Sequence, residues 1–280
     1  MTERGDIVVP QPALGVPRVV WRDGLAHRSD RTIPEETPVA LTYNRTTHAV
    51  MLATPSDLED FAYGFSLSEG IIASAAEIEA LEVITVAEGI ELRMDLVGDP
   101  LAALTRRQRR MAGASGCGLC GLESLAAAVR PVPNIPSAGM FSPAQVDAAM
   151  RALPAAQRLN HLTRAVHAAA FWTPEQGLIA VREDVGRHNA LDKLSGALIR
   201  GDQPPQEGLL LLSSRVSVEM VQKAATLGAP VIVAVSAPTA LAVRVAQEAG
   251  LTLIGIARQD GFEVFTHPHR IRPEPIQDVA

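Results

Sequence analysis

The sequence predicts an α/β protein with a smaller N-terminal α+β domain and a larger C-terminal α/β domain. In the first hundred residues, short β-prone runs surround one amphipathic helix. From residue 165 onward, continuous apolar strands alternate with helical patterns, which favours a largely parallel sheet covered on both faces. A proline-rich stretch at residues 131–139 is typical of a linker. We therefore expect domains at residues 1–132 and 133–280.

The length and the net charge of the chain limit which kinds of protein it can be. The chain has 280 residues, 47% of them hydrophobic, which is enough apolar material for a substantial core. Its net charge of −6 argues against a nucleic-acid partner, although the basic run at residues 106–110 leaves a local anionic partner open. The N-terminus lacks the pattern of a signal peptide, and no apolar run approaches roughly 20 residues. We expect a cytoplasmic protein without membrane insertion.

The N-terminal part is predicted to start with a loose arm over residues 1–17, followed by a strand near Val19. Two β-prone runs, at residues 39–43 and 48–53, are separated by polar residues and indicate a hairpin. These elements supply the first half of the α+β domain.

A helix and a second pair of strands follow. Thr54 and Pro55 match the cap and the first position of a helix, and an apolar face recurs at helical spacing up to Gly70. Residues 81–86 and 90–96 then predict two more strands.

Both cysteines of the chain, Cys117 and Cys120, lie in a glycine-rich stretch at residues 113–121. Glycine lacks a Cβ, so it lets another molecule approach a neighbouring thiol closely. Helices are predicted over residues 101–111 and from Leu122 onward, which places the cysteines just before, or on, a helix N-terminus. The positive end of the helix dipole stabilises a thiolate there, so both residues are candidate nucleophiles or ligands.

The residues leave several uses of this pair open. A structural zinc site needs about four ligands, and the chain has no second Cys-x-x-Cys and no His-x-x-x-His. A zinc deaminase needs a His-x-Glu ahead of a Pro-Cys-x-x-Cys, and neither half is present. We therefore expect no metal site. Sulfur transfer through a thiolate is favoured over two incidental core cysteines. A Cys-x-x-Cys redox protein and a non-catalytic nucleotide-binding chaperone are the alternatives.

The C-terminal part is predicted to open with a helix, because Ser142, Pro143 and Gln145 form a capping box. Strands and helices then alternate along the chain. The expected strands are residues 165–172, 178–181, 209–212, 231–235 and 251–256, and the expected helices are residues 188–200, 217–227 and 239–249.

Polar residues follow successive strands of this predicted sheet. In open α/β sheets the binding crevice lies beyond the carboxyl ends of the strands, where helix N-termini face it. Arginines and helix-start hydroxyls there suit phosphates, and Asp184 or Asp260 suits a ribose or a base. His188, at a helix start, is a stronger functional candidate than His167, which fits a buried strand equally well. We expect an anion-binding, nucleotide-like cleft.

Three segments together resemble the FdhD family: residues 116–121 (Gly-Cys-Gly-Leu-Cys-Gly), 184–193 (Asp-Val-Gly-Arg-His-Asn-Ala-Leu-Asp-Lys) and 236–242 (Ser-Ala-Pro-Thr-Ala-Leu-Ala). The second run carries most of the specificity, and the resemblance extends over nearly the whole chain. It implies a sulfurtransferase, the sulfur carrier that formate dehydrogenases need for activation. It also implies a homodimer and a cytidine deaminase-like C-terminal domain without zinc chemistry.

The resemblance further implies a route for the sulfur. A cysteine desulfurase passes sulfane sulfur to Cys117 as a persulfide. Ordinary thiol chemistry makes Cys120 a candidate to resolve or relay it. The protein then sulfurates the molybdenum cofactor, in its bis-molybdopterin guanine dinucleotide form, before insertion into apo formate dehydrogenase. The C-terminal domain binds the guanine nucleotide portion in such proteins, so GDP or GMP serves as a mimic.

The expected cofactor-binding residues lie on the loops around the strand ends. They are His167, Asp184, Arg187, His188, Asn189, Ser214, Arg215, Ser236, Thr239, Ile256, Ala257, Arg258, Gln259, Asp260 and Gly261. The chain departs from the family pattern at residues 164–165, where two glycines are common, at Ser214, where glycine is usual, and at Gly261, where arginine is frequent. We expect these departures to alter individual phosphate contacts, with Arg164 a candidate to supply the charge missing at Gly261.

Overall fold

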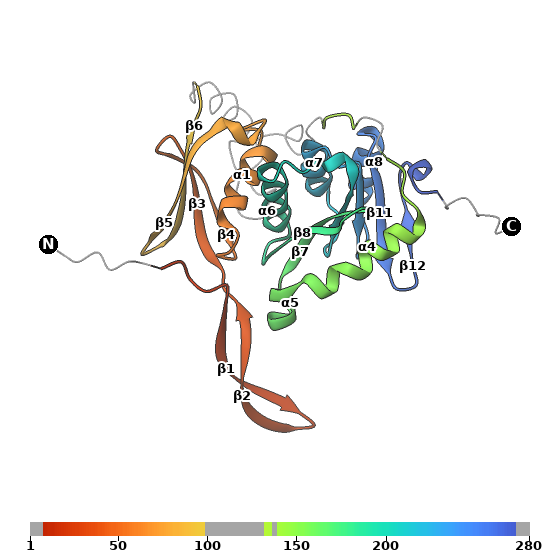
Figure 1. The fold of residues 1–280 in the computed structure, drawn as a ribbon. Coiled ribbons are helices and arrows are strands. Elements are labelled where there is room, and N and C mark those ends of the chain that lie inside the picture. The colour runs from red at the N-terminus through yellow and green to blue at the C-terminus, as the bar shows by residue number, and fades with distance from the viewer. Residues whose placement is uncertain (1–7, 99–131, 136–138, 273–280) are drawn as a thin grey trace.

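The computed structural model describes residues 8–98, 132–135 and 139–272, and the described strands form three sheets (Figure 1). A two-stranded ribbon and a four-stranded sheet come from the N-terminal part of the chain, and a six-stranded sheet comes from the C-terminal part. None of the helices in these ranges has the length and apolar character needed to span a membrane.

The ribbon consists of β1 (Ala13–Arg22) and β2 (Leu25–Pro34), and it projects away from the rest of the chain (Figure 1). Asp23 and Gly24 both have positive φ, as a two-residue hairpin turn requires. The strand predicted near Val19 is confirmed. The loose arm predicted over residues 1–17 is wrong from Ala13 onward, and β2 was not predicted.

The four-stranded sheet has the order β4-β3-β6-β5. The hairpin of β3 (Thr37–Tyr43) and β4 (Thr46–Ala53) confirms the prediction for this region, and its turn is formed by two residues, 44 and 45, which both have positive φ. The second predicted pair is also confirmed, as β5 (Ile78–Val86) and β6 (Gly89–Leu96). β3 and β6 pair in parallel at the centre of the sheet.

Helix α1 (Leu58–Ser68) packs its predicted apolar face into the core, with Phe61 and Phe65 buried. The predicted start at Thr54 and Pro55 is wrong. The helix begins at Leu58 behind Asp57, which has a left-handed backbone and makes no side-chain capping bond. The Thr54 hydroxyl instead accepts a hydrogen bond from a backbone N–H in the C-terminal part of the chain, a tertiary contact that local sequence does not reveal.

The six-stranded sheet has the order β12-β11-β10-β9-β7-β8. Its strands are β7 (His167–Thr173), β8 (Gly177–Asp184), β9 (Leu209–Leu212), β10 (Val231–Ala234), β11 (Thr252–Arg258) and β12 (Gly261–Val264). The expectation of a largely parallel sheet is wrong, because only β9-β10 and β10-β11 pair in parallel. The pairs β7-β8, β7-β9 and β11-β12 are antiparallel, and β12 was not predicted.

Helices cover both faces of this sheet, as predicted. The residues of β9 alternate between two hydrophobic clusters: Leu209 and Leu211 join the one that contains α4, and Leu210 and Leu212 join the one that contains α6, α7 and α8. The predicted capping box of Ser142 and Gln145 is present. The α-helices are α4 (Pro143–Ala156), α5 (Arg158–Thr163), α6 (Arg187–Arg200), α7 (Val218–Leu227) and α8 (Ala240–Glu248), and short 3-10 turns occupy Ala75–Glu77, Pro205–Glu207 and Pro268–Arg270.

Helices α1 and α6 meet in direct backbone contact. A Cβ at Gly64 would lie 1.6 Å from the carbonyl oxygen of Asp192, and a Cβ at Gly196 would lie 1.8 Å from that of Asp60. Only glycine permits this approach. One hydrophobic cluster contains buried residues from both helices and from both large sheets, so the N-terminal sheet is fixed to the C-terminal sheet through α1 and α6. The domain boundary expected between residues 132 and 133 stays a prediction.

Candidate functional site

The topology brings the predicted cofactor-binding loops to one edge of the six-stranded sheet. Strands β8, β9, β10 and β11 all end at this edge, because β8 and β9 both run antiparallel to the strand β7 between them. Strands β7 and β12 begin there, so His167 lies opposite Asp184 although its strand runs the other way. We call the loops at residues 184–189, 213–217, 235–239 and 256–261, together with His167, the ligand edge.

Asp184 ends β8 and is completely buried. Its Oδ2 lies 2.7 Å from the Nζ of Lys193 and accepts a hydrogen bond from the backbone N–H of Thr54. Its Oδ1 accepts hydrogen bonds from the backbone N–H of Gly186 and from the Nδ2 of Asn189. Each carboxylate oxygen therefore has two donors, which fills its ordinary capacity as an acceptor.

This arrangement corrects the expectation that Asp184 is available to a ribose or a base. Its carboxylate holds the junction between the two parts of the chain, and Asn189 extends that junction by donating from Nδ2 to the carbonyl oxygen of Leu52. The ammonium of Lys193 adds a hydrogen bond to the carbonyl oxygen of Thr54. Of the two aspartates proposed for a ligand, only Asp260 is exposed.

Arg187 and His188 form the first turn of α6, directly after the N-cap Gly186. Burial, the ammonium of Lys223 and the guanidinium of Arg187 together lower the pKa of His188 to about 4. His188 is therefore neutral at pH 7. Its Nε2 and the Nε of Arg187 are buried and have no hydrogen-bond partner among the residues that the structure describes. The stronger of the two histidine candidates thus presents an unused polar atom at the ligand edge.

His167 begins β7 at the same edge and is partly buried. Burial and the nearby Arg187 lower its pKa, and Asp184 acts in the opposite direction. The two interpretations of His167, as a core residue and as a ligand residue, are therefore both compatible with its position at the rim of the core.

The loop after β9 carries two serines, whose hydroxyls are hydrogen-bonded within the protein, and one exposed arginine. Ser213 accepts a hydrogen bond from the backbone N–H of Ala168, which fixes the loop to β7. Ser214 is buried and its hydroxyl donates to the carbonyl oxygen of Arg215. The side chain of Arg215 is exposed, so it is free to contact an anion at the ligand edge.

The loop after β10 runs beside the loop after β9. Val216 and Pro238 form a parallel bridge, and the N–H of Thr239 donates to the carbonyl oxygen of Val216. The hydroxyl of Thr239 caps α8 by accepting from the N–H of Ala242. Ser236 is partly exposed, and its carbonyl oxygen accepts a long hydrogen bond from Ile256.

The segment at residues 256–261 has an unusual backbone. Ile256 has a φ of 52°, a left-handed conformation that is an outlier for a β-branched residue, and the pairing of β11 with β12 shifts register between Gly255 and Arg258. Such strain is concentrated at ligand sites, where the surrounding structure enforces it. Ala257 is buried, whereas residues 258–260 are exposed at the turn into β12, where Gly261 has a φ of 132°.

Two residues at the start of α7 are absent from the predicted cofactor-binding residues: Ser217, which belongs to the predicted cleft, and Glu219, which lies just beyond the ligand edge. Ser217 is the N-cap of α7, but within the described part of the chain its side chain makes no capping bond and its buried Oγ has no partner. Glu219 lies in the first turn of α7, and its Oε2 is likewise buried with no partner in the ranges given above. Both look like ordinary helix-start residues in the sequence, so only their surroundings distinguish them.

The predicted catalytic residues, Cys117 and Cys120, lie outside the described residues, as do the helices expected over residues 101–111 and from Leu122. Their roles stay predictions.

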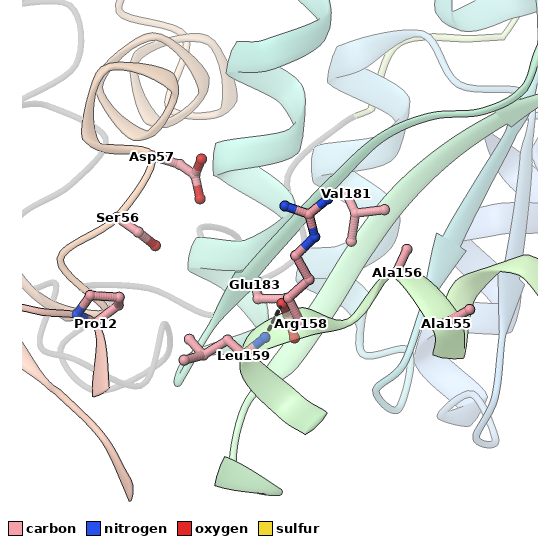
Figure 2. Close-up of a pocket in the computed structure, with 9 residues that line it drawn as sticks. All are labelled: Pro12, Ser56, Asp57, Ala155, Ala156, Arg158, Leu159, Val181 and Glu183. Carbon is pink, nitrogen blue, oxygen red and sulfur yellow. Dashed lines mark hydrogen bonds between the residues drawn. The ribbon is translucent and has the colours of Figure 1, made fainter. Parts of the chain in front are cut away.

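A separate cavity of about 460 Å³ lies beside β8, between the segment before α1 and the start of α5 (Figure 2). The carboxylate of Glu183 faces this cavity but already accepts hydrogen bonds from the backbone N–H groups of Leu159 and Asn160. Asp57, on another wall, forms an ion pair with Arg182. None of the predicted cofactor-binding residues lines the cavity, so we place the candidate site at the ligand edge.

The sequence of this chain is similar to those of known proteins. A family model described as FdhD/NarQ matches residues 34–272. A protein of Agrobacterium fabrum named sulfur carrier protein FdhD is 51% identical over 91% of this chain and 95% of its own length. A protein of Bordetella petrii with the same name is 48% identical over 90% of each chain.

A solved structure is also similar to this chain, at a lower sequence identity. A crystal structure from Desulfotalea psychrophila, provisionally described as a formate dehydrogenase accessory protein, matches with a TM-score of 0.74 and 25% identity. The match covers 93% of this chain and all of that one. The likeness therefore extends over most of the fold.

Proposed function

Because the chain belongs to the FdhD/NarQ family, we propose that it is a sulfur carrier that acts as a sulfurtransferase in the activation of formate dehydrogenase. The observation that carries this proposal is the near-complete match to proteins named as sulfur carriers, at about half identity over nine-tenths of both chains. The description of the solved relative as a formate dehydrogenase accessory protein supports the choice of client.

In the first proposed step, sulfur is loaded onto Cys117. The Cys117 thiolate attacks the outer sulfur of a cysteine desulfurase persulfide, so a new S–S bond forms on Cys117 and the desulfurase leaves as a thiolate. This exchange moves one neutral sulfur atom and needs no added electrons. A glycine-flanked thiol suits it, because the partner persulfide must approach closely.

In the second proposed step, the sulfur is released for delivery to molybdenum. The Cys120 thiolate attacks the inner sulfur of the Cys117 persulfide, which forms a Cys117–Cys120 disulfide and expels hydrosulfide. The two thiols supply the two electrons that convert sulfane sulfur to sulfide, and the hydrosulfide becomes a ligand of the metal. A dithiol reductant then restores both thiols for the next cycle.

The proposed recipient is the bis-molybdopterin guanine dinucleotide form of the molybdenum cofactor, held as substrate at the ligand edge. The exposed guanidinium groups of Arg215 and Arg258 suit its phosphates. The unpartnered polar atoms of α6 and α7 and the strained backbone at Ile256 suit a bound ligand. We further propose that the protein works in the cytoplasm as a homodimer, with apo formate dehydrogenase as the final partner.

Mass spectrometry after incubation with a desulfurase and cysteine tests the proposal. We expect an addition of about 32 Da, one sulfur atom, on Cys117. Cys117→Ala should abolish this addition and the activation of formate dehydrogenase while leaving GDP binding intact. Cys120→Ser should still be loaded but should release sulfide more slowly.

Two other results would support the alternative functions. A reversible Cys117–Cys120 disulfide without any persulfide would indicate a redox protein. Full activation by a variant that lacks both thiols would indicate a non-catalytic nucleotide-binding chaperone.

A further inference from the structure

The ribbon of β1 and β2 carries exposed apolar side chains but belongs to neither hydrophobic cluster of the described residues. The exposed side chains are those of Leu14, Val19, Trp21, Leu25 and Ile33. A two-stranded ribbon that projects from the body buries little surface, so it adds little to the stability of the fold (Figure 1). Apolar groups gathered on such an exposed element are typical of a surface that binds another protein.

The pairing of β1 with β2 divides the ribbon into two faces of different charge. Directly paired residues share a face, and successive residues of a strand alternate between faces. The even-numbered residues of β1 and the odd-numbered residues of β2 therefore form one face, which we call the basic face. It carries Arg18, Arg22 and Arg31 and no carboxylate, whereas the opposite face carries Arg28 and Asp30.

The charge of the ribbon is opposite to that of the rest of the chain. Residues 13–34 contain four arginines and two aspartates, a net charge of +2 in a chain of −6, so the remainder carries −8. A body of that charge repels an extended polyanion such as a nucleic acid or an anionic membrane. A protein with a local acidic patch avoids most of this repulsion.

The apolar part of the basic face also favours a protein. Leu25 is 64% exposed and is paired directly with Arg22, so an apolar group and a guanidinium lie side by side near the tip of the ribbon. Arginine among apolar groups is typical of protein–protein interfaces, whereas contacts to a phosphate backbone are polar. The positive charge requires an acidic surface on the partner.

The base of the ribbon lies beside the ligand edge. Arg31, on the basic face, donates from Nη2 to the carbonyl oxygen of Thr163 at 3.0 Å. Thr163 ends α5, and His167 begins β7 four residues later, a span of at most about 14 Å. The ribbon itself is about 34 Å long, close to the diameter of a small domain. A protein bound along the basic face therefore comes close to the loops of the ligand edge.

We propose that the basic face of the ribbon binds an acidic, partly apolar surface of the enzyme that receives the sulfurated cofactor. The ribbon thereby holds this enzyme next to the edge from which the cofactor leaves. The inference rests on the proposed function, which supplies the identity of the partner as apo formate dehydrogenase.

Biolayer interferometry between the full chain and purified apo formate dehydrogenase tests the proposal. Arg22→Glu should weaken binding by about tenfold or more at low salt, because it places a carboxylate against an acidic surface. This loss should shrink at high salt, where the repulsion is screened. Leu25→Ser should weaken binding at both salt concentrations, because an apolar contact is not screened.

Arg28→Glu is the matched control, since it makes the same change of charge on the opposite face of the ribbon. It should stay within about twofold of the wild-type affinity. GDP binding and persulfide loading of Cys117 should be unchanged in Arg22→Glu, which shows that the variant is folded. Equal weakening by Arg22→Glu and Arg28→Glu overturns the assignment, as does wild-type affinity in both Arg22→Glu and Leu25→Ser.

Other occupants of the basic face give different results. If Arg22→Glu abolishes self-association, desulfurase binding, or binding to DNA or anionic vesicles while dehydrogenase binding is unchanged, the proposal is overturned. Absence of dehydrogenase binding by the wild-type chain overturns it as well. A wild-type chain that acquires no persulfide and activates no dehydrogenase refutes the proposed function instead, so the two failures are distinguishable.

Discussion

The carboxylate of Asp184 and the ammonium of Lys193 lie 2.7 Å apart, and neither side chain has any exposed surface. Thr54 joins this pair by donating its N–H to Asp184 and accepting from Lys193 at its carbonyl oxygen. A residue that follows β4 is thereby fixed to the strand and helix that border the ligand edge. The ion pair thus positions the start of α6 relative to the N-terminal sheet.

Lys193→Met should destabilise the protein by about 3–5 kcal/mol, because it leaves a buried carboxylate without its counter-charge. The free energy of unfolding in urea provides the measurement. Arg93→Met is the control, because Arg93 pairs with Glu91 at the surface and should cost less than about 1 kcal/mol. Equal losses of unfolding free energy in Lys193→Met and Arg93→Met would contradict the conclusion that the Asp184 carboxylate holds the junction.

Gly64→Ala should force α1 and α6 apart, because the new methyl group would overlap the carbonyl of Asp192. We expect a loss of about 3 kcal/mol or more in unfolding free energy, at the upper end of overpacking effects. A Cβ at Gly15, on the projecting ribbon, meets no atom of the described residues within 4 Å, so Gly15→Ala should be nearly neutral. A Gly64→Ala protein as stable as Gly15→Ala would show that the helices do not touch there.

His188 should make the protein less stable in acid. Its folded-state pKa is about 4 and its ordinary value is 6.5, so between these values the unfolded chain binds a proton that the folded chain does not. The stability is complete above pH 6.5 and falls as the pH falls toward 4, by about 2–3 kcal/mol at pH 4.5.

Urea unfolding at pH 7 and pH 4.5 measures this effect. His188→Gln should lose less stability between the two pH values than the wild-type protein does. The control is His27→Gln on the exposed ribbon, which should follow the wild-type dependence. If His188→Gln loses as much stability between pH 7 and pH 4.5 as the wild-type protein does, His188 is not the source of this pH dependence.

Arg215→Ala and Arg258→Ala should each weaken GDP binding by about tenfold, because each removes an exposed guanidinium that suits a phosphate. The loss should shrink at high salt, where screening already weakens these contacts. Arg244→Ala, on the exposed side of α8, is the control. Calorimetry showing wild-type affinity for either variant would remove that arginine from the site.

Local patterns predicted most of the regular elements correctly. The capping box at Ser142, the apolar runs of the six-stranded sheet and the hairpin before Thr54 all satisfy short-range rules. The errors arise where a distant contact overrides such a rule. Thr54 has the sequence of a helix cap, but its hydroxyl is used by Val185, 131 residues away.

The ribbon and the strand directions show two other limits of prediction from the sequence. Strand β2 is mostly polar and is exposed along most of its length, so no apolar alternation marks it. Strand β7 has the same apolar character as its neighbours, and nothing in that character reveals that it runs the other way. The ligand edge could be predicted because polar residues follow the strands. The saturation of Asp184 could not, because its donors come from the segment before α1, from the loop after β8 and from α6.

The projecting ribbon also gives the protein a built-in optical signal. The chain has two tryptophans: Trp21 on the ribbon is 71% exposed, and Trp172 in β7 is 7% exposed. A soluble quencher such as iodide should reach Trp21 readily, whereas the emission of Trp172 should shift to longer wavelength only when the sheet unfolds. Contact with the ribbon and loss of the fold can therefore be followed separately in one unlabelled sample.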